Sequence, residues 1–290
     1  MPAPATLVPD VVARAEAFPL ERLHAVAFPL ERLHAVVSGP EDAPPLLALH
    51  GWGSSAALMA PAANAVSDGF RVHTLDLPGH GLTPPPAEPW GVPEYAALVA
   101  RYLDAHGLDA PMPAIGHSNG GRILLHMAAS EDLAGWFSKL VLVSPSGVAP
   151  IPSAEVRRKR ALAKTLRAPF NLLPDGRIKD EALDWLRHTY LWQRLGSSDY
   201  NALQGVMRET FVKTVGFHVD DRLSTIRVPV LVLWGDGDTA VSRHQVDTLV
   251  REIPDAGLVV LDGAGHYGYL DRMDVFAAAT RHFLGLEGTI

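Results

Sequence analysis

The chain has 290 residues, of which 25 are basic and 32 acidic, so its formal net charge is −7 at pH 7. This acidic balance disfavours nucleic acid as a partner, and the absence of cysteine excludes disulfides, thiolate catalysis and cysteine-ligated metals. Hydrophobic residues make up 48% and charged residues 20%, which is typical of soluble globular proteins with one large domain or two modest ones.

The N-terminal residues 1–16 lack a basic segment followed by an apolar run, so the sequence predicts no signal peptide. No apolar stretch has the length that a membrane-spanning helix needs. We therefore expect a cytoplasmic protein without a membrane span. The one basic cluster, residues 157–160, is interpreted as a solvated helix face rather than a site for a polyanion.

A ten-residue sequence, AFPLERLHAV, occurs at residues 17–26 and again, unchanged, at residues 27–36. Two short copies do not make a solenoid. The last four residues of the unit alternate as in a strand, and a shift of ten keeps each side chain on its face because the pleat repeats every two residues. Only the second copy continues into residues 37–40, where an early hairpin is expected.

Strand-like and helix-like segments then alternate along the chain. The expected strands are residues 45–49, 71–77, 114–116, 140–143, 228–234 and 258–261. The expected helices are residues 56–67, 93–106, 122–129, 242–253 and 271–284, the first of which Pro61 is expected to interrupt. This alternation predicts an α/β fold with a mostly parallel central sheet and helices on both faces.

The alternation stops between residues 148 and 226, which are mostly helical in pattern. We expect this segment to be an inserted helical lid over the carboxyl edge of the sheet, where ligands bind in such folds. The expected domains are an α/β core in two parts, residues 1–147 and 227–290, and a lid at 148–226. Within the lid, aromatic side chains are expected either to line an apolar substrate pocket or to form the lid's own core. They include Trp185, Tyr190 and Trp192.

A serine stands at the apex of a predicted strand–turn–helix, in the sequence Gly116-His117-Ser118-Asn119-Gly120. A G-x-S-x-G sequence in that context is typical of a nucleophile elbow. The glycines leave room for neighbouring chain at so tight a turn, and the start of the helix adds partial positive charge. The sequence therefore predicts Ser118 as a nucleophile.

A serine hydroxyl needs a base within hydrogen-bond reach, and the base needs an orienting acid. His266 follows the last predicted strand, in a loop that should converge on the elbow. Asp238 follows the preceding strand and is preferred as the acid over Asp236, its competitor in the same loop. The acid could also have followed the predicted strand at residues 140–143, but position 144 is a serine, so that location is excluded.

Two backbone N–H groups are expected to form an oxyanion hole. The residue after the nucleophile, Asn119, supplies one. The loop at residues 50–53 is rich in glycine and suits a close approach, so Trp52 is expected to supply the other. Other histidines and acids near these motifs are expected to be structural; they are His24, His34, His80, His117, Asp76, Asp262 and Asp271.

With these residues in place, the chain from about residue 32 onward resembles the serine hydrolases of the α/β-hydrolase fold, particularly small, lidded, esterase-like members. The motifs that carry the resemblance are His50–Gly53, Asp76–Gly81, Gly116–Gly121, Trp234–Asp238 and Gly265–His266. The resemblance implies a triad of Ser118, Asp238 and His266, with Trp52 and Asn119 as oxyanion donors.

Two features of the sequence disfavour particular activities within this fold family. Serine at position 118 speaks against haloalkane dehalogenases and epoxide hydrolases, which carry aspartate there. His266 is followed by Tyr267-Gly268-Tyr269 rather than by the tryptophan associated with carbon–carbon bond hydrolases of ring-cleavage products, which makes that activity less favoured.

The predicted function is hydrolysis of small-to-medium carboxylic esters through an acyl-enzyme, with no metal and no cofactor. Alternatives on the same triad are a carbon–carbon bond hydrolase, a perhydrolase or an acyltransferase. A further alternative is a ligand-binding receptor with vestigial hydrolysis. The expected partner is a small-molecule ester, and the protein is expected to be a monomer or a homodimer that the duplicated segment influences.

The first repeat copy, residues 17–26, is hypothesised to form an extra edge strand that two chains could exchange; the alternative is a functionally silent insertion. Deleting residues 17–26 separates these two hypotheses. Loss of a dimer in light scattering would support the edge strand, because an exposed strand edge pairs with another chain. Unchanged activity and oligomeric state would refute it.

Overall fold

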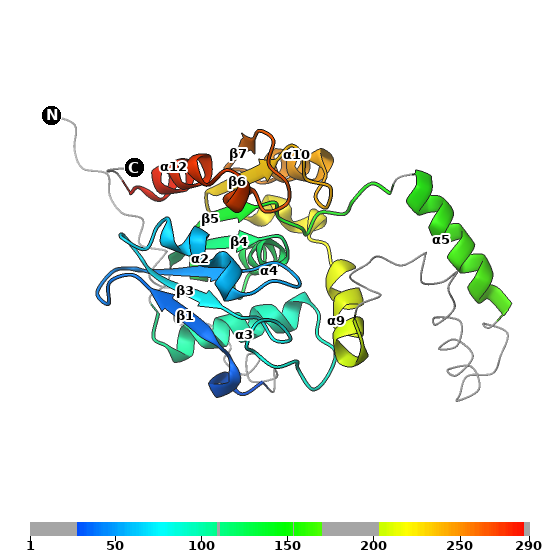
Figure 1. Cartoon of the computed structure of the whole chain (residues 1–290), viewed down its shortest axis with the longest axis horizontal. Coiled ribbons are helices and arrows are strands. Elements are labelled where there is room, and N and C mark those ends of the chain that lie inside the picture. Colours follow the sequence, from blue (N-terminus) through cyan, green and yellow to red (C-terminus); the bar gives the residue numbers. More distant parts are fainter. Residues whose placement is uncertain (1–27, 109–110, 153, 170–202, 287–290) are drawn as a thin grey trace.

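The computed structural model describes residues 28–108, 111–152, 154–169 and 203–286. The first repeat copy lies outside the described residues, as do the proposed lid residues Trp185, Tyr190 and Trp192. The described residues form a central sheet covered by helices on both faces (Figure 1).

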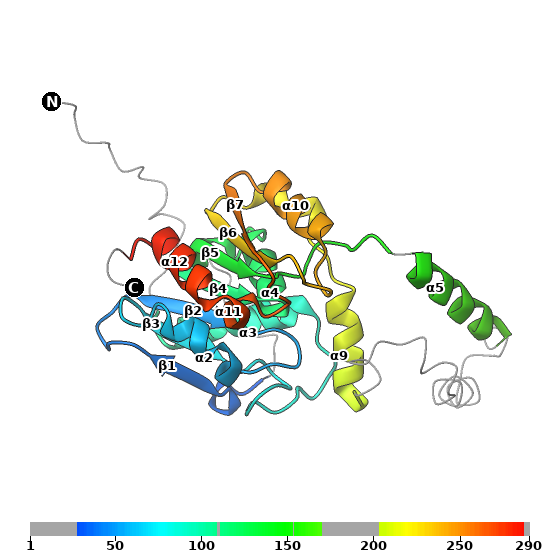
Figure 2. The ribbon, with the colours of Figure 1, turned by 45° about the horizontal axis from the view of Figure 1, so that its top comes forward.

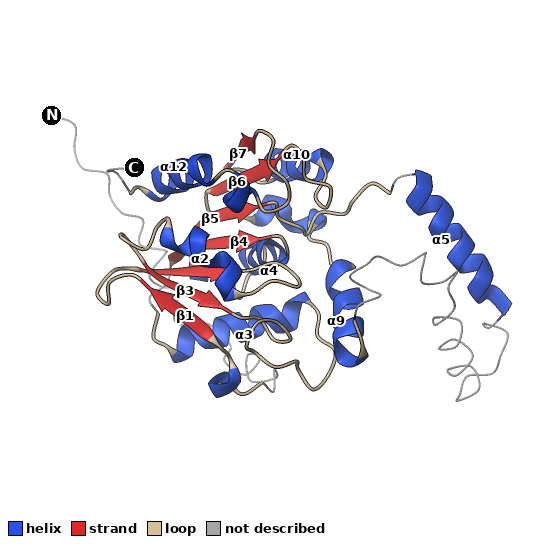
Figure 3. Ribbon diagram, viewed as in Figure 1, coloured by secondary structure: helices blue, strands red, loops and turns tan. Residues whose placement is uncertain are grey.

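Among the described residues, seven strands form one sheet in the spatial order β1-β3-β2-β4-β5-β6-β7 (Figure 3). They are β1 Ala35–Ser38, β2 Pro45–Leu49, β3 Arg71–Leu75, β4 Met112–His117, β5 Phe137–Val143, β6 Val230–Gly235 and β7 Ala256–Leu261. Strand β1 is antiparallel to β3, and every other neighbouring pair is parallel. The prediction of a mostly parallel sheet is confirmed.

Helices α3, α4 and α10 pack on one face of the sheet, and α2, α11 and α12 pack on the other (Figure 2). Their bounds are α2 Ala56–Asn64, α3 Val92–Ala105, α4 Asn119–Ala128, α10 Arg243–Glu252, α11 Gly268–Asp271 and α12 Met273–Leu284. Leu47 and Leu49 of β2 belong to the first core layer. Leu46 and Ala48 alternate with them and belong to the second, because successive side chains of a strand point to opposite faces.

The start of the sheet differs from the sequence prediction. Strand β1 does not form a hairpin with β2; it pairs with β3, with Ala35 opposite Leu75. Strand β2 is hydrogen-bonded by β3 on one side and β4 on the other, so it has no free edge for β1. The outer edge of β3 is the position left for the antiparallel strand.

One helix also differs from prediction. Helix α2 continues through Pro61 and ends at Asn64 rather than near residue 67. Its buried face, which includes Met59 and Ala62, packs on the sheet and outweighs the backbone hydrogen bond that proline removes. The predicted final helix, residues 271–284, corresponds to α12, and the short helix α11 precedes it, separated by Arg272, whose φ of −134° is not helical.

Helices α5 (Ala154–Arg167) and α9 (Gly205–Val215) belong to the segment inserted between β5 and β6. Helix α5 stands away from the sheet in both views, whereas α9 lies at the carboxyl ends of the strands (Figures 1 and 2). Short 3-10 turns complete the described elements at Leu30–Arg32, Ala134–Trp136 and Asp220–Thr225. Within the described ranges, every helix is too short or too polar to cross a bilayer.

Candidate active site

Ser118 occupies a strained turn between β4 and α4. Its φ is +49° and its ψ is −110°, a backbone conformation that residues other than glycine rarely adopt. The turn requires glycine nearby, because a β-carbon at Gly120 would collide with the carbonyl of Leu49. A β-carbon at Gly121 would meet Pro145 at 2.8 Å. The tight packing of these segments holds the serine at the carboxyl edge of the sheet.

Hydrogen bonds attach the turn to the neighbouring strand. The Ser118 amide donates to the carbonyl of Val143, the last residue of β5, over 3.0 Å. The Ser118 carbonyl accepts from the amides of Arg122 and Ser146, each over 3.1 Å. The serine backbone is therefore tied to β5, to α4 and to the first residues after β5.

His266 and Asp238 meet across two loops, with 2.9 Å between His266 Nδ1 and Asp238 Oδ2. The Asp238 side chain is fully buried, and that of His266 is 23% exposed. The other carboxylate oxygen of Asp238 accepts from the amides of Ala240, over 2.7 Å, and Val241, over 3.0 Å. An ionised carboxylate only accepts, so His266 donates from Nδ1 and leaves the lone pair of Nε2 available for a proton.

The ionisation of Asp238 follows from these contacts. Burial by itself would raise the pKa of this carboxyl. The hydrogen bonds from His266, Val241 and Ala240 outweigh burial and hold the pKa below its ordinary value. Asp236, the competing acid, forms no hydrogen bond with His266 among the described residues; its carboxylate accepts from the Gly263 amide over 2.7 Å and braces the neighbouring loop.

His117, next to the serine, supports the loop that carries His266. Its Nε2 donates to the His266 carbonyl over 2.9 Å, and the two rings lie 4.8 Å apart. Burial, followed by the charge of His266, lowers the pKa of His117 to about 3. Gly51 packs against both His117 and Ser118, since a β-carbon there would stand 2.9 Å from each side chain. Among the described residues no hydrogen bond joins Ser118 Oγ to His266. The hydrogen bond from His117 to the His266 carbonyl connects the serine turn to the His266 loop.

The loop with Trp52 follows β2 and is organised by His50, whose role the sequence did not reveal. His50 Nδ1 donates to the Gly51 carbonyl over 2.7 Å, and His50 Nε2 accepts from the Leu77 amide over 3.0 Å. Burial, followed by the proximity of His80, lowers the pKa of His50 to about 4. A neutral, buried histidine thus spans the ends of β2 and β3 and holds the glycine-rich loop.

The Trp52 ring lies between two aromatic neighbours. Its centroid is 4.8 Å from that of His80 and 5.1 Å from that of Phe211 in α9. This places the inserted segment directly against the loop proposed for the oxyanion hole. His80, expected to be structural, packs in this stack beside His50.

Asp76 braces the turn that follows β3, which was the role expected from the sequence. One carboxylate oxygen accepts from the Ala56 amide over 2.6 Å. The other accepts from the Leu82 amide and from His34 Nδ1, over 2.9 and 2.8 Å. Since His34 belongs to the second repeat copy, that copy has a structural role in the sheet edge.

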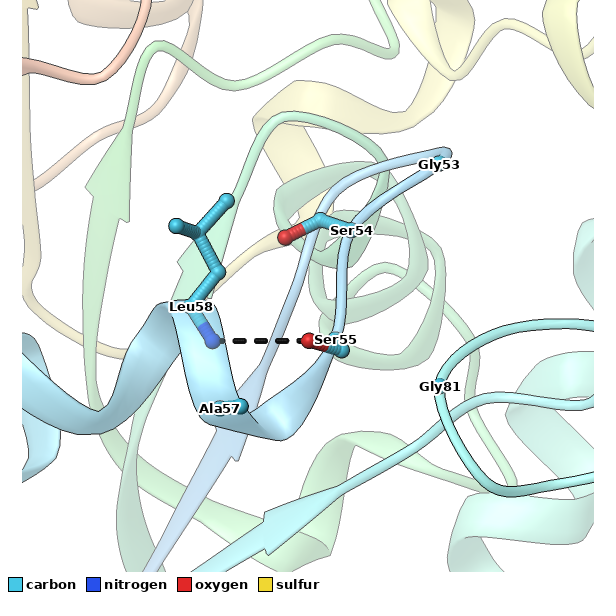
Figure 4. Close-up of a pocket in the computed structure, with 6 residues that line it drawn as sticks. All are labelled: Gly53, Ser54, Ser55, Ala57, Leu58 and Gly81. Atoms are coloured by element: carbon cyan, nitrogen blue, oxygen red, sulfur yellow. Dashed lines mark hydrogen bonds between the residues drawn. The ribbon is translucent and has the colours of Figure 1, made fainter.

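An open surface pocket of about 570 Å³ lies beside the Trp52 loop (Figure 4). It is lined by Gly53, Ser54, Ser55, Ala57, Leu58 and Gly81. Ser55 Oγ accepts from the Leu58 amide over 3.4 Å and caps α2 (Figure 4). The pocket therefore adjoins the Trp52 loop rather than the Asp238–His266 pair. Within the described ranges, no group of three histidine or acidic side chains is placed to hold a metal.

Comparisons with known proteins agree with the fold. A family model described as the alpha/beta hydrolase fold matches residues 44–272. Among curated proteins, the chain is similar to the pimeloyl-acyl-carrier-protein methyl ester esterase of Xanthomonas campestris pv. campestris, with 26% identity over 260 residues, which cover 83% of this chain and 95% of that protein.

Two solved structures are also similar. One is a hydrolase from Pseudomonas aeruginosa, with a TM-score of 0.65 and 23% identity, covering 87% of this chain and 94% of that chain. The other is the 2-hydroxy-6-oxo-6-phenylhexa-2,4-dienoate hydrolase of a Rhodococcus species, with a TM-score of 0.64, 22% identity and the same coverage of 87% and 94%. At these identities the solved structures establish the fold alone.

The buried histidines generate a prediction about acid stability. The pKa of His50 is lowered to about 4 and that of His117 to about 3, whereas histidines of an unfolded chain titrate near ~6.5. Between those values the unfolded state binds more protons. We predict that these histidines leave the free energy of unfolding unchanged above about pH 6.5. As the pH drops below about 6.5, each of them lowers the free energy of unfolding by about 1.4 kcal/mol per pH unit.

Denaturant titrations at a series of pH values down to 5 measure this slope. The variant His117→Asn is expected to show a shallower slope, because it removes one of the protonation sites. An unfolding free energy that is equal at pH 7.5 and pH 5 would contradict the assignment of neutral, buried histidines.

Proposed function

The chain belongs to the α/β-hydrolase fold family, and we propose that it hydrolyses carboxylic esters through an acyl-enzyme on Ser118. His266 is the general base and Asp238 the acid that orients it. The hydrogen bond between His266 Nδ1 and the buried, otherwise saturated Asp238 carboxylate carries this proposal. The strained turn at Ser118 supports it, since strained non-glycine backbone is concentrated at functional sites.

In the proposed reaction, His266 Nε2 takes the Ser118 proton as Oγ attacks the ester carbonyl. The oxyanion of the tetrahedral intermediate accepts hydrogen bonds from the amides of Trp52 and Asn119. The intermediate then expels the alcohol, which takes the proton from His266, and leaves the acyl group on Ser118. Water, activated by His266 in the same way, attacks the acyl-serine and releases the carboxylic acid.

Asp238 acts throughout as a carboxylate. Its lowered pKa keeps it ionised when His266 is transiently protonated. The buried charge then stabilises the imidazolium and keeps Nδ1 as the donor, so that Nε2 remains the working atom. The three hydrogen bonds to the carboxylate compensate its burial.

The inserted segment, residues 148–226, is proposed to be the lid. Phe211 of α9 contacts Trp52, so the insert reaches the oxyanion loop. Small-to-medium esters fit a site covered in this way, and Trp185, Tyr190 and Trp192 remain proposed as pocket residues. The methyl ester named for the Xanthomonas relative is consistent with an ester substrate.

We predict that Ser118→Ala lowers kcat by about 10⁴–10⁶ across a series of p-nitrophenyl esters from acetate to long acyl chains. The substitution removes the hydroxyl that we propose attacks the ester. Wild-type turnover should show an optimum of chain length. Equal turnover by Ser118→Ala and the wild type would contradict the assignment of Ser118 as the nucleophile. Turnover of a dienoic ketoacid alone would indicate a carbon–carbon bond hydrolase instead of an esterase. Turnover only with peroxide or an alcohol as acceptor would indicate a perhydrolase or an acyltransferase.

A pair of variants separates the two candidate acids. Asp238→Asn should lower kcat by about 10⁴, because the amide changes the histidine tautomer. Asp236→Asn is the matched control: its amide oxygen can still accept from Gly263, so kcat should stay within about twofold. Steady-state kinetics measures both. A larger loss for Asp236→Asn than for Asp238→Asn would reverse the assignment.

A further inference from the structure

Arg122 lies one helical turn beyond Ser118 on α4. Its amide donates to the Ser118 carbonyl over 3.1 Å, and residues four apart are neighbours on one side of a helix. Only 7% of Arg122 is exposed, so the arginine is a buried cation close to the proposed nucleophile. Burial lowers its pKa to about 10, which still leaves it charged at neutral pH.

The hydrogen bonds of the guanidinium go to neutral oxygens. Nη1 donates to the Thr214 carbonyl at the end of α9 over 2.5 Å, and weakly to Asn119 Oδ1 over 3.5 Å. Within the described part of the chain, no carboxylate forms an ion pair with Arg122. Asp220, close enough to His218 to affect its pKa, is exposed and accepts from the Ala149 amide instead.

Four buried polar atoms around this guanidinium have no hydrogen-bond partner among the described residues. They are Arg122 Nε, Asn119 Nδ2, Thr214 Oγ1 and His218 Nδ1. The first two can only donate. The hydrogen bonds of Arg122 place Asn119 and Thr214 beside it, and its charge lowers the pKa of His218 in addition to burial. Donors and a positive charge therefore converge at one place between α4 and α9.

Such an arrangement is costly unless an acceptor is supplied. A buried charge without a counter-charge, and buried donors without acceptors, each oppose folding. Among the described residues, both hydrogen bonds of the guanidinium come from Nη1, which leaves the edge formed by Nε and Nη2. That edge matches the two oxygens of a carboxylate, which arginine binds with two parallel hydrogen bonds.

We propose that Arg122, with Asn119 Nδ2 beside it, binds a carboxylate carried by the ester substrate. The substrate class is thus an ester whose acyl chain ends in a carboxylate, such as the half-ester of a dicarboxylic acid. The ester carbonyl lies at Ser118, and a short aliphatic chain spans the distance to Arg122. This inference rests on the proposed function of Ser118.

A purely structural role for Arg122 makes a different prediction. A cation at the carboxyl end of α9 also stabilises that helix end through its carbonyl groups. If Arg122 only holds α9, its removal affects charged and neutral substrates equally. If it binds the substrate, the loss falls on the charged ester alone.

The test compares the monomethyl and dimethyl esters of succinate, glutarate and adipate, with proton release followed at constant pH. These pairs differ in charge and share a carbon chain. The wild type should prefer the monoester at the chain length that spans the two residues. Arg122→Gln should lower kcat/KM for that monoester by about 10- to 100-fold, as expected for losing a charge-assisted hydrogen-bond pair, and leave the diester within about threefold. Arg122→Lys should retain part of the preference, since it keeps the charge without the planar edge.

Lys213→Gln is the matched control, because Lys213 of α9 is, like Arg122, a cation that donates to a backbone carbonyl, but its acceptor is Pro89. It should leave the preference for the monoester unchanged. An equal loss for mono- and diesters in the Arg122 variants would overturn the subsite in favour of the helix-holding role. A wild type without any preference for a monoester would overturn it as well.

Binding without turnover separates this inference from the proposed function. Calorimetry should show that Ser118→Ala binds adipate or glutarate, and that Ser118→Ala with Arg122→Gln binds it at least about tenfold more weakly. Thermal unfolding checks that both variants are folded. If no ester is hydrolysed but the two variants differ in dicarboxylate affinity, the carboxylate subsite is supported and the proposal of ester hydrolysis is refuted. If esters are hydrolysed and no dicarboxylate binds, the subsite fails alone.

Discussion

The close approach of the β2 carboxyl end to the start of α4 is the constraint on which the rest of the site depends. Ser118 adopts a φ of +49° because the chain must reverse within one residue between β4 and α4. Gly120 permits it, since any side chain there would strike the Leu49 carbonyl. The same contact brings the Trp52 loop beside the serine. The proposed nucleophile and oxyanion loop therefore share one packing requirement.

The loops around the elbow are held by buried histidines rather than by ion pairs. His50 joins the ends of β2 and β3, and His117 joins the elbow to the His266 loop. Each is kept neutral mainly by burial, and a neutral ring can donate from one nitrogen and accept at the other. Two buried carboxylates lie among these loops: Asp76 braces the turn after β3 through backbone amides and His34, and Asp238 faces His266. Asp238 and the buried Arg122 are the two charges that we propose act on other groups.

The sequence predicted the elements whose signal is local. The sheet strands are continuous apolar runs, and Ser118, Asp238 and His266 each follow a strand, so parallel topology brings them to one edge. The preference for Asp238 over Asp236 had no decisive local signal, because both stand in one loop; the hydrogen bond to His266 distinguishes them in space. The position of β1 could not be predicted, since it depends on which strand edge remains free. The environment of Arg122 was likewise hidden, because its partner Thr214 is distant in sequence and buried charge is a tertiary property.

Covalent labelling tests the central claim most directly, that Ser118 is a nucleophile activated by the His266–Asp238 pair. A fluorophosphonate probe reacts with an activated serine without requiring the correct ester. After labelling and proteolysis, mass spectrometry should locate one adduct on the peptide that contains Ser118, and labelling should be much slower in Asp238→Asn. A folded protein that is not labelled, or an adduct on another serine, would contradict the account.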